Sequence, residues 1–163
     1  MKHVWAIICV ALTFGNSALA QGLESGGLSE AQTHRVVAAI ESVFETCARI
    51  DPVYRPDCAG RALQRGAGKI SNNPGYWEAE VALTRAVRSL AKIVRDHEDE
   101  DARSLREDGY RFKPVRADRL REVTIQGAEV FRRLEADFAS GTASETLYFA
   151  PIVRLLEEKR PWP

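Results

Sequence analysis

The sequence is poor in the residues that redox and metal chemistry require: it has 1 methionine (Met1), 3 histidines and 3 cysteines among 163 residues. It also carries no net charge, because 23 Lys and Arg balance 23 Asp and Glu. No global charge therefore draws the chain toward nucleic acid or an anionic membrane. Hydrophobic residues make up 45% of the chain, which excludes wholesale disorder and fits one globular domain.

These scarcities exclude several functions that helical proteins commonly perform. No Cys-x-x-Cys-His motif is present for covalent haem. Neither His34 nor His97 has the Glu three residues earlier that di-iron bundles use. The common hydrolase and nucleotide-binding motifs are also missing. We therefore expect no cofactor, no metal and no identifiable catalytic residue. A metal at His97, within the acidic run 96–101, is the weaker alternative to a solvated acidic surface.

The one long apolar run lies at the N-terminus and has the features of an export signal. Lys2 and His3 precede the apolar stretch Val4–Phe14, and Ala18-Leu19-Ala20 forms a small-x-small cleavage site. The run is shorter than the roughly 20 apolar residues of a transmembrane helix. We expect residues 1–20 to be a signal peptide that is cleaved near Ala20. The mature protein would then be periplasmic or secreted, without a transmembrane anchor.

Export changes what the cysteines are expected to do. Cys9 would leave with the signal peptide, so the mature chain would keep Cys47 and Cys58. Two cysteines in an oxidising compartment favour a disulfide, and the prolines between them favour a turn. A redox pair and two free thiols are the alternatives, although a redox pair normally has the spacing Cys-x-x-Cys. We predict a structural Cys47–Cys58 disulfide.

Hydrophobic periodicity along the mature chain is helical throughout. Spacings of three and four residues, together with the capping pairs Ser29/Gln32 and Thr142/Glu145, predict an all-α fold, a bundle of four to five helices. Residues 21–28 read as a flexible leader and 29–163 as a single helical-bundle domain. No alternating strand pattern is evident, and 103–114 reads as a link or a frayed helical extension. The predicted helices cover about 29–50, 57–70, 74–94, 115–139 and a stretch from 142 in which Pro151 imposes a kink or a restart.

The most suggestive feature for function is a basic segment that follows the acidic run 96–101. Tyr110 and Phe112 are interleaved with its cations, and few acids oppose them. The segment is a candidate contact for an anionic partner; the alternative is that the acidic run neutralises it internally. Its seven cations are Arg103, Arg106, Arg111, Lys113, Arg116, Arg119 and Arg121.

Three functions are consistent with these features. The leading hypothesis is an exported, periplasmic-type helical bundle that acts as a non-enzymatic binding or interaction module, with a protein or an anionic envelope component as partner. The first alternative is a carrier that holds a small molecule or cofactor between its helices. The second is an envelope enzyme that acts on cell-wall material through carboxylates that the sequence does not identify.

Overall fold

The computed structural model describes residues 27–160. The predicted signal peptide, the leader up to residue 26 and the closing Pro161-Trp162-Pro163 lie outside the described residues. Leu28, at the end of the predicted leader, is only 4% exposed and belongs to the hydrophobic core.

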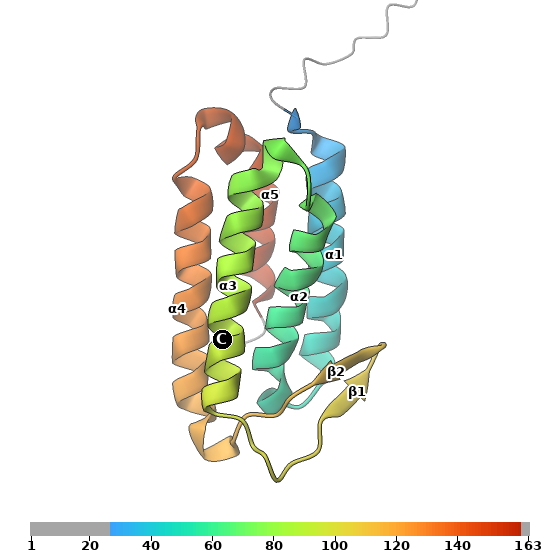
Figure 1. Ribbon diagram of the computed structural model, residues 1–163, viewed down its shortest axis with the longest axis vertical. Helices are drawn as coiled ribbons and strands as arrows, with labels where there is room; N and C mark the ends of the chain where they lie inside the picture. The colour runs from blue at the N-terminus through green and yellow to red at the C-terminus, as the bar shows by residue number, and fades with distance from the viewer. Residues whose placement is uncertain (1–26, 161–163) are drawn as a thin grey trace, which may run out of the picture.

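The described chain forms an all-α bundle, as the sequence predicted. Consecutive helices run antiparallel and pack side by side (Figure 1). The last helix packs against both the first and the fourth, so the five helices close into a ring around the main core. The helices are α1 (Glu30–Arg49), α2 (Arg55–Ile70), α3 (Trp77–Asp96), α4 (Leu120–Ala139) and α5 (Ala143–Lys159).

Two of the predicted helix starts are made by the expected side chains. The Ser29 hydroxyl accepts a hydrogen bond from the Gln32 backbone N–H at 3.2 Å and caps α1. Thr142 and Glu145 form a reciprocal capping box at the start of α5. Pro151 lies inside one uninterrupted helix, so the expected restart does not occur. Proline removes one backbone hydrogen bond and crowds the carbonyl four residues earlier, but the buried Phe149 and Ile152 beside it hold the segment against the core.

Aromatic side chains fill the interior of the ring. Phe44 of α1 contacts Phe131 of α4, with ring centroids 6.2 Å apart. Phe149 of α5 contacts both Tyr76 and Phe138, at 5.8 and 5.5 Å. The contacts of Phe44 with Phe131 and of Tyr76 with Phe149 join segments that are distant in the sequence, so most of the ring shares one core.

The segment 103–114 differs from the prediction, because it contains a β-hairpin instead of a link or a helical extension. Strands β1 (Leu105–Glu107) and β2 (Tyr110–Phe112) pair antiparallel beside the ends of α1 and α2 (Figure 1). Asp108 and Gly109 connect them with φ angles of 48° and 79°. An Asp-Gly pair with two positive φ angles is typical of tight hairpin turns.

The fourth helix also begins later than predicted, at Leu120 and not near 115. Val115 is extended because its N–H donates to the Val53 carbonyl at 2.9 Å. The next N–H, that of Arg116, donates to the His97 carbonyl at 2.9 Å. His97 is the C-cap of α3, so the helix ends before it.

Candidate functional site

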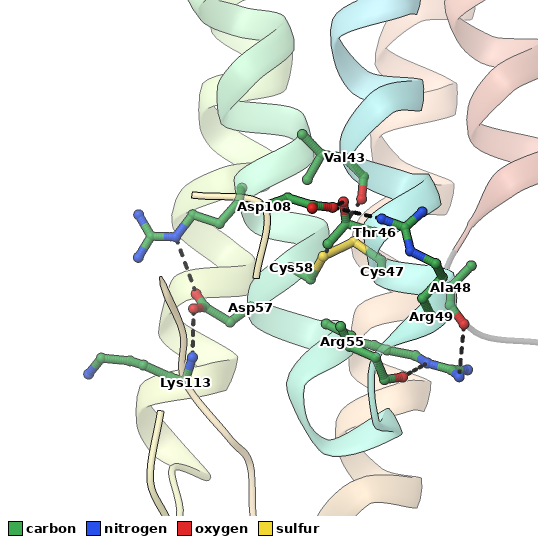
Figure 2. The surroundings of a disulfide bond; sticks show 12 residues. Val43, Thr46, Cys47, Ala48, Arg49, Arg55, Asp57, Cys58, Asp108 and Lys113 are labelled. Atoms are coloured by element: carbon green, nitrogen blue, oxygen red, sulfur yellow. Dashed lines mark hydrogen bonds and ion pairs between the residues drawn. A yellow bond between two sulfur atoms is a disulfide. The ribbon is translucent and has the colours of Figure 1, made fainter. Parts of the chain in front are cut away.

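The Cys47–Cys58 disulfide joins α1 to α2, in agreement with the sequence prediction. The two Cα atoms are 5.6 Å apart, and both cysteines are fully buried. Closing a loop of this length stabilises a domain by roughly 2–4 kcal/mol, mainly by restricting the unfolded chain. The bond fixes the ends of two helices against which the hairpin rests (Figure 2).

The hairpin is attached to the bundle on both sides of this disulfide. At its turn, the Asp108 carboxylate accepts hydrogen bonds from the Thr46 hydroxyl at 2.6 Å and from the Arg49 guanidinium at 2.7 Å. At its other end, the Asp57 carboxylate accepts from the Lys113 backbone N–H at 2.9 Å (Figure 2). Thr46 directly precedes Cys47, and Asp57 directly precedes Cys58. The disulfide therefore sets the separation of the two points that hold the hairpin.

Asp57 is the most unusual acid of this region, because it is buried beside the disulfide. Burial raises the pKa of the Asp57 carboxyl and outweighs the opposing effects of the Lys113 N–H and the Arg61 charge. Only 3.8 Å separates the Arg61 Nε from the Asp57 Oδ1. Asp57 thus acts as a structural anchor whose pKa is raised by burial.

The hairpin places two arginines of the basic segment directly opposite each other. In its register Leu105 pairs with Phe112, Arg106 with Arg111, and Glu107 with Tyr110. Phe112 is fully buried, whereas Arg106 and Arg111 are exposed. Alternation along a strand puts these arginines on the face opposite to Phe112. Like charges directly opposite in an antiparallel pair are destabilising, so the fold gains nothing from this pairing.

The seven cations of the basic segment fall into two groups. Three of them are paired with nearby acids. Lys113 contacts Glu98 at 2.7 Å, Arg116 contacts Asp118 at 2.8 Å, and Arg119 contacts Glu122 at 3.4 Å. Within residues 27–160, the other four have no carboxylate partner: Arg103, Arg106, Arg111 and Arg121.

The acidic run 96–101 neutralises little of the basic segment. Glu98 pairs with Lys113, but Asp96 pairs with Lys92 of its own helix. Asp99 accepts hydrogen bonds from the backbone N–H groups of Asp101 and Ala102. His97 lies 4.0 Å from the Glu122 carboxylate. In the described part of the chain, no three His, Cys, Asp or Glu side chains are placed to hold a metal ion.

A second cationic feature, which the sequence interpretation missed, lies along α2. A groove of about 360 Å³ is lined by five residues of that helix and by Tyr110 of the hairpin. We call it the α2 groove; no acidic side chain lines it. Its cations recur every four residues, a spacing that would have revealed a basic helix face. The lining residues are Arg61, Gln64, Arg65, Gly68, Lys69 and Tyr110.

A larger groove of about 570 Å³ lies between α3 and α4, and we call it the α3/α4 groove. It is also lined by four cations, but each of these is paired with an acid that lines the same groove. The pairs are Arg85–Asp137, Lys92–Asp96, Arg132–Glu129 and Arg133–Glu129.

No helix within residues 27–160 is both long enough and apolar enough to cross a bilayer. Comparison of the chain with protein families, with curated proteins and with solved structures finds no match.

Proposed function

We propose that the protein is an exported, non-enzymatic binding module that contacts an acidic protein surface through the outer face of its hairpin. The observation that carries this proposal is the cross-strand pair of Arg106 and Arg111. Both are exposed, neither has a carboxylate partner within the described residues, and their proximity opposes folding. An acidic partner would relieve the repulsion and gain charge-assisted hydrogen bonds.

The attachment of the hairpin supports the same proposal. Asp108 and Asp57 hold its two ends, and Phe112 is buried beneath it. The arginine pair is therefore presented on a fixed support. Rigid presentation reduces the entropy lost when a partner binds.

Export of the protein rests on the N-terminal sequence and on the chemistry of the cysteines. The basic start, apolar stretch and Ala18-Leu19-Ala20 favour cleavage before Gln21. A disulfide is typical of oxidising compartments. N-terminal sequencing of protein recovered from the envelope fraction tests the proposal, and a mature chain beginning at Gln21 is expected.

The interior of the bundle favours recognition at the surface over transport of a ligand between the helices. The space that a carrier would use contains the contacts of Phe44 with Phe131 and of Phe149 with Tyr76 and Phe138. Tyr76 is anchored in addition, because its hydroxyl donates to the Ser29 carbonyl at 2.7 Å.

The test compares mature wild-type protein with the double variant Arg106→Gln/Arg111→Gln, using poly-L-glutamate as an acidic polypeptide probe. Exposed charges act mainly on association, so the variant should associate roughly tenfold more slowly at low salt. Binding by the wild type should weaken steeply as salt rises. The matched control is Arg132→Gln/Arg133→Gln, which removes two exposed but paired cations from α4. Equal association by all three proteins would refute the proposal.

A further inference from the structure

The α2 groove has the geometry of an anion site that is separate from the hairpin arginines. Arg61, Arg65 and Lys69 follow one another at intervals of four residues along α2. Side chains at this spacing share one face of a helix, and the outer two are about 12 Å apart along the axis. Tyr110 reaches the same groove from β2 and forms its second side.

The charges of the groove oppose the stability of the helix that carries them. Like charges four residues apart destabilise a helix. Arg61 is partly compensated, because it lies 3.8 Å from Asp57. Arg65 and Lys69 have no carboxylate partner within the described residues. Stability of the fold therefore does not account for this arrangement.

Gly68 provides a second, independent observation. A Cβ atom built at this position meets nothing within 4 Å, so packing does not require a glycine here. Glycine inside a helix is destabilising relative to alanine. Gly66, two residues earlier, is different, because a Cβ there would lie 2.5 Å from the Ile40 side chain. The missing side chain at Gly68 keeps the groove open.

We propose that the α2 groove binds a phosphate monoester. After compensation of one charge by Asp57, its three cations leave a net charge of about two, and a phosphate monoester carries about −1.5 to −2 at neutral pH. Arg61 and Arg65 offer planar guanidinium groups suited to phosphate oxygens, and Lys69 offers a mobile point charge. The Gln64 amide and the Tyr110 hydroxyl supply further donors. The volume of about 360 Å³ leaves room for the organic part of the ligand.

The first test titrates isotope-labelled mature protein with inorganic phosphate and follows its amide resonances, with sodium chloride added to hold ionic strength constant. Saturable shifts are expected in α2 from 61 to 69 and at Tyr110. Shifts that do not saturate, or that chloride reproduces, would overturn the proposal.

Two variants separate shape from charge. Gly68→Leu fills the groove and keeps every charge, whereas Arg65→Gln/Lys69→Gln removes two charges and keeps the shape. Each should weaken phosphate binding at least tenfold while the protein still unfolds cooperatively. The control Arg132→Gln/Arg133→Gln should bind as the wild type does. Phosphate binding that survives in either groove variant would overturn the assignment.

Two further experiments identify the source of the phosphate and the site at which it binds. Cosedimentation with phosphatidylcholine vesicles containing phosphatidic acid, lost in Gly68→Leu, would support a lipid headgroup. Binding of inorganic phosphate without cosedimentation would support a soluble ligand. Loss of phosphate binding in Arg106→Gln/Arg111→Gln, with full retention in Gly68→Leu, would overturn the groove assignment. Poly-L-glutamate binding tests the proposed function separately, because it depends on the hairpin arginines.

Discussion

The α2 groove and the α3/α4 groove are both rich in cations, yet they differ in how those cations are compensated. In the α3/α4 groove each cation has an acid that lines the same groove. In the α2 groove no acid is among the lining residues, and only Arg61 lies close to a carboxylate. The number of cations on a surface is therefore a poor guide to its electrostatic potential. The cations without acidic partners make the α2 groove the more positive of the two.

The two grooves also differ in what supports them. The α3/α4 groove lies between two helices of the ring, and both of its walls are helical. One wall of the α2 groove is the hairpin residue Tyr110, whose position depends on the attachment of the hairpin. Perturbing the disulfide should therefore affect the α2 groove more than the α3/α4 groove.

The largest effect is expected from the double variant Cys47→Ala/Cys58→Ala. Loss of the disulfide should lower the free energy of unfolding by about 2–4 kcal/mol, measured from denaturant midpoints. Hydrogen exchange should rise first in the hairpin amides, since Thr46 and Asp57 lose their fixed separation. Equal acceleration of exchange in α4 would contradict the asymmetry between the two grooves.

A pair of glycine variants of α2 should have effects of opposite sign. Gly66→Ala should destabilise the protein by about 1–3 kcal/mol, because the new methyl group would overlap the Ile40 side chain. Gly68→Ala should stabilise it by about 0.5–1 kcal/mol, because the position is open and helical. Thermal unfolding of both variants checks the prediction. A loss of stability in Gly68→Ala would show that the groove is not open.

The raised pKa of Asp57 should make the free energy of unfolding depend on pH. Because burial raises the pKa of Asp57 in the folded state, the folded protein binds this proton more tightly than the unfolded chain. The contribution of this proton to the free energy of unfolding is complete below the pKa of the unfolded chain, about 3.9. It is lost as pH rises through the raised pKa of the folded protein. Asp57→Asn should reduce this decline, since its amide oxygen still accepts from the Lys113 N–H. Urea unfolding of both proteins across this range measures the slope, and equal slopes would refute the prediction.

The smallest effects come from single cations of the two grooves. Arg85→Gln breaks the pair with Asp137 and should cost about 0.2–1 kcal/mol. Arg65→Gln relieves two like-charge pairs, with Arg61 and with Lys69, and should raise the free energy of unfolding by about 0.4–1 kcal/mol. Both effects should shrink at high salt. Chemical denaturation measures both changes. If the two variants change the free energy of unfolding in the same direction, the two grooves do not differ in how their cations are compensated.

The helices were predictable because their apolar periodicity is long and their caps are local. Val36, Ile40 and Val43 follow the helical repeat and are buried as expected, and Ser29 caps the helix that it was predicted to start. The disulfide was predictable for a different reason, since only two cysteines follow the predicted signal peptide. In each case the sequence pattern that allows the prediction lies within one helix or in the number of cysteines.

The hairpin was missed because its strands have only three residues each, too few for alternation to stand out. The Asp108-Gly109 pair was the available signal. The α2 groove was harder to find, because Tyr110 is brought to α2 only by the fold. The contrast between Gly66 and Gly68 likewise depends on Ile40 from another helix. Long-range contacts of this kind leave no periodic trace in the sequence.

The way in which the hairpin is attached has a consequence for ligand kinetics. Its strands pair only with each other in the described sheet, and Asp108, Asp57 and Phe112 provide much of its attachment to the bundle. Such an element opens at a lower free energy than the ring of helices, and local openings of this kind occur well below global unfolding. Opening of the hairpin would remove Tyr110 from the α2 groove. If the groove binds a phosphate monoester, a variant with a less stable hairpin should therefore release the ligand faster.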